Sequence, residues 1–65
     1  MKLNVPAIKR LMAMQRLTQI ELADKTGLSR QSIGYILARG TSTVANAGKL
    51  ADALGVDVSE IWNET

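Results

Sequence analysis

The chain has 65 residues, a formal net charge of +2, and neither Cys nor His. This length suits one domain, close to the lower size at which a single hydrophobic core folds without staples. The missing Cys and His exclude disulfides, Cys/His zinc sites, thiol nucleophiles and the usual acid-base residue at neutral pH. Nor is there a glycine-rich phosphate loop. We therefore expect a single domain over residues 1–65, with no enzymatic activity and no cofactor.

No apolar run approaches the roughly 20 residues of a membrane-spanning helix. Residues 1–10 mix charged and apolar side chains, which is not the pattern of a signal peptide. We therefore expect a cytoplasmic protein that has no contact with a membrane.

Charge is unevenly distributed along the chain. Residues 1–40 carry seven Lys or Arg against two Asp or Glu, whereas residues 41–65 carry one against four. Clustered positive charge is typical of a phosphate-binding face, with the acidic end turned away from nucleic acid. A merely solvated surface explains the charge equally well, so charge alone does not decide the function.

All the periodic segments indicate short helices. The first spans about 6–15, where Ile8, Leu11, Met12 and Gln15 share one face after Pro6. Helical spacing of apolar residues also predicts a fourth helix over about 44–54, ending at a glycine. A short fifth helix is expected after a possible Asp57–Glu60 capping box. The sequence therefore predicts an all-α bundle of five short helices.

Two of these helices are expected to form a tight corner. Thr18 and Glu21 match a capping box at the start of a short helix that ends at Gly27. Ser29 is a second N-cap, beginning a helix that runs to about Ala38. A turn of three or four residues therefore joins the two helices, which is the helix-turn-helix pattern.

Residues 18–36 read T-Q-I-E-L-A-D-K-T-G-L-S-R-Q-S-I-G-Y-I. This segment resembles the Cro/CI-type helix-turn-helix family, called XRE, which includes the lambda and 434 phage repressors. The segments I-K-R-L before it and L-A-D-A-L-G-V-D-V-S-E-I-W after it are similar to family segments too, so the resemblance covers nearly the whole chain. It places the motif at about 18–37 and implies binding to double-stranded DNA.

The resemblance implies that the third helix enters the DNA major groove with its first residues against the base edges. Arg30 is then a candidate to bond guanine and Gln31 to pair with adenine. Tyr35, one turn later, is a candidate to touch a thymine methyl group or a phosphate. The plainer interpretation is that Arg30 and Gln31 are solvated and that the Tyr35 ring packs on its own helix.

Contacts to the DNA backbone are implied on both sides of the third helix. Gln19 matches the glutamine with which the family clamps a phosphate, and Thr18 and Ser29 are further donors. The family also runs the following loop along the phosphates, which here places Arg39, Thr41, Ser42 and Thr43 there. This loop departs from the family pattern, being about one residue shorter with its glycine displaced.

Three further departures from the family pattern carry structural expectations. Met12 and Leu37 stand where members often bury an Arg–Glu ion pair, which predicts an apolar contact in its place. Arg16 stands where a helix-ending glycine is common, which predicts a residue at positive φ or an altered turn. Met14 replaces a usual charge, and either faces a partner or fills a gap in the core.

The leading functional hypothesis is a regulator, and specifically a repressor, that binds a palindromic operator as a homodimer. The fourth and fifth helices and Trp62 are the expected dimer surface, unless Trp62 belongs to the core. One alternative is an antitoxin or adaptor that also binds a protein partner through its C-terminal half. The other is the DNA-binding part of a longer repressor, which the ending at Asn63, Glu64 and Thr65 suits.

Overall fold

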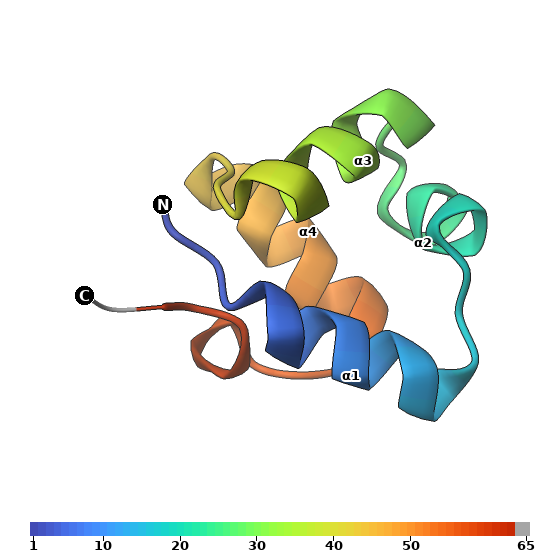
Figure 1. The fold of residues 1–65 in the computed structure, drawn as a ribbon, viewed down its shortest axis with the longest axis horizontal. Helices are drawn as coiled ribbons and strands as arrows, with labels where there is room; N and C mark the ends of the chain where they lie inside the picture. The colour runs from blue at the N-terminus through green and yellow to red at the C-terminus, as the bar shows by residue number, and fades with distance from the viewer. Residues whose placement is uncertain (64–65) are drawn as a thin grey trace.

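The computed structural model describes residues 1–63. It contains four α-helices and one 3-10 turn, namely α1 (Val5–Gln15), α2 (Gln19–Thr26), α3 (Arg30–Arg39), α4 (Val44–Leu54) and η1 (Val58–Glu60) (Figure 1). The expected all-α class is confirmed. None of the described helices is long and apolar enough to cross a membrane. Glu64 and Thr65, on which the expectation of a longer repressor partly rests, lie outside the described residues.

Each α-helix begins where a side chain accepts a hydrogen bond from the backbone N–H three residues later. These N-cap residues are Asn4, Thr18, Ser29 and Thr43. Such caps satisfy one of the free N–H groups of the first turn. Thr18 and Ser29 stand where the sequence predicted them. Asn4 begins α1 slightly earlier than predicted, because its side chain accepts from the Ala7 N–H at 3.1 Å.

The helices end at residues in the left-handed conformation. Gly27 closes α2 at φ 76°, where a glycine has no Cβ to clash with the following carbonyl. The end of α1 is different, because Arg16 occupies the same region at φ 56°. The expectation of a non-glycine residue at positive φ is therefore confirmed.

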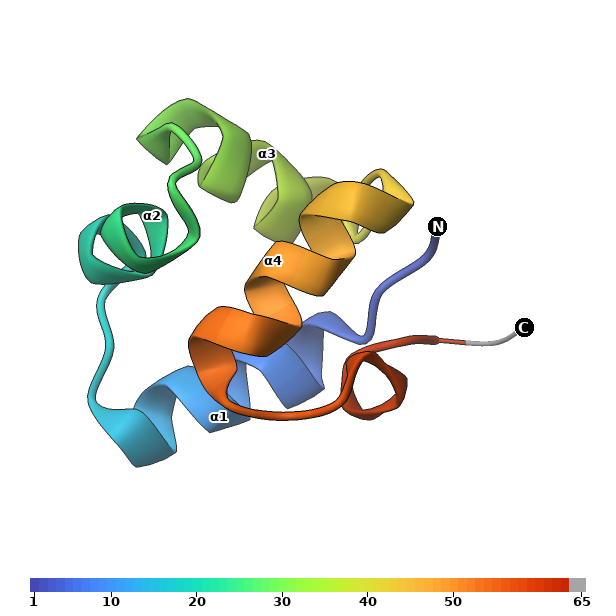
Figure 2. The same ribbon diagram turned by 180° about the vertical axis from the view of Figure 1, so that it is seen from behind.

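The core lies where α4 crosses between α1 and α3, as both views show (Figures 1 and 2). Its largest fully buried side chains are Ile8, Leu22, Ile33, Leu50, Leu54 and Ile61. Met12 and Leu37 belong to the same apolar cluster, each 7% exposed, as expected of a replaced ion pair. Within residues 1–63 no polar or charged side chain is buried, so apolar packing holds the helices together.

The predicted fifth helix is a single 3-10 turn. The Asp57 side chain accepts from the Ser59 N–H at 2.9 Å, and the Glu60 N–H donates to the Asp57 carbonyl. This three-residue spacing closes a 3-10 turn rather than an α-helical one. Ile61 follows directly and is fully buried, so the chain turns inward before another helical turn forms.

Among the described residues, five large apolar side chains stay at the surface, namely Met14, Ile20, Tyr35, Val44 and Trp62. Met14 on α1 is 73% exposed, so it does not fill a gap in the core. Trp62 is 46% exposed, so its indole is only partly covered.

The first residues of the chain pair with two distant segments. Lys2 forms an antiparallel bridge with Thr41, and Leu3 forms one with Trp62. We call residues 1–4 the N-terminal strap. The sequence did not predict this pairing, because it joins segments that lie far apart along the chain.

Candidate nucleic-acid interface

A short turn fixes α3 against α2. Residues 27–29 connect the helices, and the Thr26 hydroxyl accepts a hydrogen bond from the Leu28 N–H at 3.2 Å. Ala23 is 3% exposed in α2, which contacts both α3 and α4. A small side chain here lets the helices approach closely, so their crossing angle is set by packing.

The outer face of α3 carries the three side chains expected to contact bases. Arg30 and Gln31 lie exposed in its first turn. Tyr35 follows one turn later and is 55% exposed, while Ile33 and Ile36 are buried on the opposite face. The helix therefore presents hydrogen-bonding groups outward from a buried apolar stripe.

The Tyr35 ring is covered on one side by Arg39 at the end of the same helix. The guanidinium carbon of Arg39 lies 5.4 Å from the ring centroid. This is within the range of a cation–π interaction. The ring therefore has a charged neighbour while more than half of the Tyr35 side chain remains exposed.

The start of α2 is held by a reciprocal pair of hydrogen bonds. The Thr18 N–H donates to the Glu21 carboxylate at 3.0 Å, and the Glu21 N–H donates to the Thr18 hydroxyl at 3.1 Å. The first of these bonds is the main reason why the pKa of Glu21 lies below its ordinary value of 4.5. Thr18 keeps its own hydroxyl proton, and Gln19 beside it is exposed.

The start of α3 contains two neighbouring hydroxyls. The Ser29 hydroxyl accepts from the Ser32 N–H at 3.0 Å and lies 2.9 Å from the Ser32 hydroxyl, to which it donates. Each serine hydroxyl has one proton, and one proton joins the two. The pair therefore retains one proton that can bond an outside acceptor.

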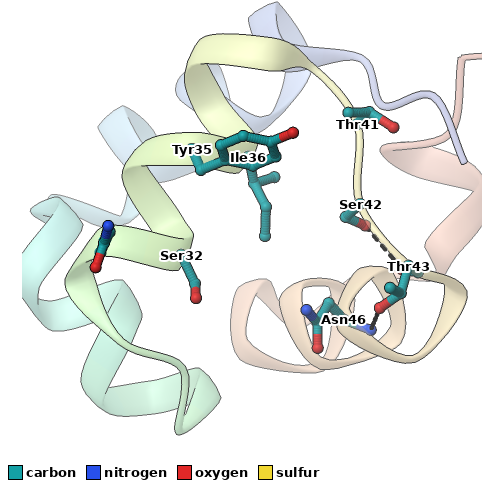
Figure 3. Close-up of a pocket in the computed structure, with 8 residues that line it drawn as sticks. Ser32, Tyr35, Ile36, Thr41, Ser42, Thr43 and Asn46 are labelled. Carbon is teal, nitrogen blue, oxygen red and sulfur yellow. Dashed lines mark hydrogen bonds between the residues drawn. The ribbon is translucent and has the colours of Figure 1, made fainter.

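A polar groove runs between α3, the loop that follows it and the first turn of α4 (Figure 3). Its volume is about 340 Å³. Its lining residues are Gln31, Ser32, Tyr35, Ile36, Thr41, Ser42, Thr43 and Asn46. The groove brings five of the expected DNA-contacting residues together, namely Gln31, Tyr35, Thr41, Ser42 and Thr43. Its lining includes none of the others.

Two of the three loop hydroxyls donate to carbonyls inside the protein. The Thr41 hydroxyl donates to the Met1 carbonyl at 3.1 Å, and the Ser42 hydroxyl donates to the Thr43 carbonyl at 2.8 Å. Both residues are half-buried. Their protons are therefore already committed. The exposed Thr43 hydroxyl only accepts, from the Asn46 N–H at 3.1 Å, so its own proton remains to meet a phosphate.

A helix-turn-helix family model matches residues 8–61. The chain belongs to the helix-turn-helix family. The Cro/CI-type resemblance is thereby confirmed, and it assigns sequence-specific DNA binding to a helix-turn-helix regulator. Searches among curated proteins and among solved structures found no significant match. Helix-turn-helix domains of this type are DNA-binding regulators rather than an enzyme family.

Two polar residues that line the polar groove were not among the DNA-contacting residues predicted from the sequence. Ser32 lies on α3 beside Gln31, and Asn46 lies in the first turn of α4, both half-buried. Ser32 had a local signal, since it is the third residue after the N-cap Ser29. Asn46 faces α3 only because of the angle between α3 and α4, for which the sequence has no local signal.

Proposed function

We propose that this chain binds a palindromic DNA operator as a homodimer and represses transcription there. The observation that carries the proposal is the exposed N-terminal face of α3, held by packing against α2. A helix on such a corner fits the major groove, with half-sites about one helical turn, roughly 34 Å, apart.

Base recognition is assigned to α3. Arg30 offers two parallel N–H groups that match the O6 and N7 acceptors of guanine. Gln31 offers an amide donor and acceptor that match adenine. Tyr35 contacts a thymine methyl group or a phosphate with the exposed part of its ring. The exposure of all three side chains supports these roles.

Phosphate contacts are assigned to the two ends of this surface. Thr18, Gln19 and Ser29 lie at the starts of α2 and α3, where free N–H groups and the helix dipoles favour an anion. Arg39 contributes charge at the end of α3. Thr41 contributes through its main-chain N–H, because its hydroxyl proton is engaged. Ser42 lies in the same loop, but both its hydroxyl and its N–H donate to carbonyls within the protein.

The dimer interface is assigned to the C-terminal part of the chain. Trp62 is 46% exposed there, and a large ring that is half covered in one protomer suits burial against a second copy. Residues 41–65 carry four acidic residues against one basic residue, which favours keeping this half away from DNA.

The test is selection of binding sites from a random DNA pool, followed by titration of the recovered site at two salt concentrations. We expect a palindrome with a steep salt dependence. Arg30→Ala should relax the preference at one base position, whereas Gln19→Ala should weaken binding to all sequences alike. A site without symmetry, bound by one protomer, would contradict the homodimer.

A second candidate is favoured by Met14, which is 73% exposed on α1. A single exposed apolar side chain is common on protein surfaces. The candidate therefore rests on Met14 together with Trp62, which is 46% exposed in the C-terminal half through which an antitoxin or adaptor would bind its partner. Failure of the pool to enrich any sequence would contradict the repressor proposal and would leave binding to a protein partner as the function to test.

A further inference from the structure

The N-terminal strap lies between the loop that follows α3 and the C-terminal segment. Both ribbon views show the blue start of the chain running between the yellow loop and the red end (Figures 1 and 2). The loop, residues 40–43, walls one side of the polar groove. The strap therefore contacts the loop that forms part of the polar groove.

Three consecutive loop residues bond to the strap. The Leu3 N–H donates to the Gly40 carbonyl at 2.8 Å, and the Ser42 N–H donates to the Met1 carbonyl at 3.0 Å. The Thr41 hydroxyl donates to that same Met1 carbonyl at 3.1 Å. The Thr41 hydroxyl thus makes the one side-chain hydrogen bond in a contact that is otherwise made by backbone groups.

The strap is itself anchored on its other edge. The Asn63 N–H donates to the Lys2 carbonyl at 3.1 Å, and the Asn4 N–H donates to the Ile61 carbonyl at 2.8 Å. The Leu3 side chain is 4% exposed and belongs to the core cluster. A strap fixed in this way can hold the loop at a constant position relative to α3.

The loop needs such support because residues 40–43 carry no charge and include no buried apolar anchor. We propose that the strap positions this loop for DNA, and that Thr41 is a positioning residue whose hydroxyl secures the strap rather than contacting a phosphate. The proposal rests on the proposed function. A hydroxyl whose only proton is donated to Met1 has none to offer a phosphate oxygen, which is purely an acceptor.

The test compares Thr41→Val with Thr41→Ser in the full chain. Valine keeps the shape of threonine and loses the hydroxyl, whereas serine keeps the hydroxyl. With the selected operator as probe, Thr41→Val should bind about fivefold more weakly, the size expected for one lost hydrogen bond. Thr41→Ser should bind like the wild type. Binding to a random-sequence duplex should weaken by a similar factor in Thr41→Val and be unchanged in Thr41→Ser, because the loop is proposed to meet phosphates, which every sequence presents.

Hydrogen exchange at the Ser42 amide provides a readout that does not involve DNA. This N–H bonds to the Met1 carbonyl, so a loosened strap exposes it to solvent more often. We expect about fivefold faster exchange in Thr41→Val and wild-type exchange in Thr41→Ser. Amides within α1 and α4 should be unaffected in both variants.

The outcomes separate this proposal from the proposed function. Unchanged Ser42 exchange in Thr41→Val would overturn the positioning role whether or not the chain binds DNA. If Thr41→Val exchanges faster at Ser42 but keeps its operator affinity, DNA binding does not depend on the position of the loop. That result would also overturn the positioning role. If the wild type selects no sequence, the proposed function fails, and the strap has no role in DNA binding.

Discussion

The Arg39 guanidinium lies over the Tyr35 ring, one helical turn apart on the exposed side of α3, with 5.4 Å between the guanidinium carbon and the ring centroid. Residues four apart on a helix are neighbours, so the pair needs no distant element to form it. The arrangement places Tyr35, the last candidate base-contacting residue along α3, beside Arg39, which is proposed to contact the DNA backbone.

This pair should stabilise the fold slightly. In a double-mutant cycle with Tyr35→Leu and Arg39→Gln, we expect a coupling of about 0.5 kcal/mol in the free energy of unfolding, as for an exposed cation–π contact. Denaturant unfolding of the four proteins measures it. Strictly additive effects would show that the two side chains are close without interacting. Arg39→Lys, which keeps the charge and loses the planar group, should lie between the wild type and Arg39→Gln.

Arg16 offers a stabilising substitution. It holds φ 56°, a conformation that costs an L-residue roughly 1–2 kcal/mol. Arg16→Gly removes this strain but gives the unfolded chain more freedom, so we expect a net gain of about 0.5–1 kcal/mol. Arg16→Ala is the control, since it removes the same side chain and retains the strain. Equal stabilities for the glycine and alanine variants would contradict the strain argument.

Met12 and Leu37 should behave as a replaced ion pair. Met12→Arg or Leu37→Glu alone places an uncompensated charge in the core and should cost about 3 kcal/mol or more. The double variant should be at least about 1 kcal/mol more stable than the sum of the single effects. Thermal unfolding followed by circular dichroism measures this, with Met12→Leu as a volume-matched control. Additive losses would mean that the two positions do not face each other.

The capping box of α2 should make stability depend on pH. Hydrogen bonding lowers the folded-state pKa of Glu21 below 4.5, so its contribution is complete above that pH and is lost as the pH falls through the folded-state value. The wild type should therefore lose stability on acidification. Glu21→Gln, which keeps a hydrogen-bonding side chain without the charge, should lose less. Parallel unfolding curves between pH 7 and about 3 would contradict this assignment.

Local signals account for the part of the fold that was predicted. Thr18, Gly27 and Ser29 each act through neighbours within four residues, so their roles follow from short sequence patterns. The first four predicted helices therefore appear close to their expected bounds. The DNA-contacting roles of Arg30, Gln31 and Tyr35 remain predictions, although their exposure suits them.

Features that depend on distant segments were not predicted. The Lys2–Thr41 and Leu3–Trp62 bridges join residues that are far apart along the chain and meet only in the folded molecule. Asn46 reaches the groove for the same reason. The Asp57–Glu60 pattern was misleading, because Ile61 is drawn fully into the core and the chain turns inward after one 3-10 turn.

The strap also bears on how the chain folds. The contacts within the helices and across the α2–α3 turn are local and cost little loop-closure entropy, so they favour rapid folding. The Leu3–Trp62 bridge instead closes a loop of almost the entire described chain. The strap should thus join last, onto helices already assembled, and detach first under mild denaturation. Detachment of the strap would release the loop that lines the polar groove before the helices melt. A regulator with this arrangement would therefore lose affinity for its operator while its helices are still folded.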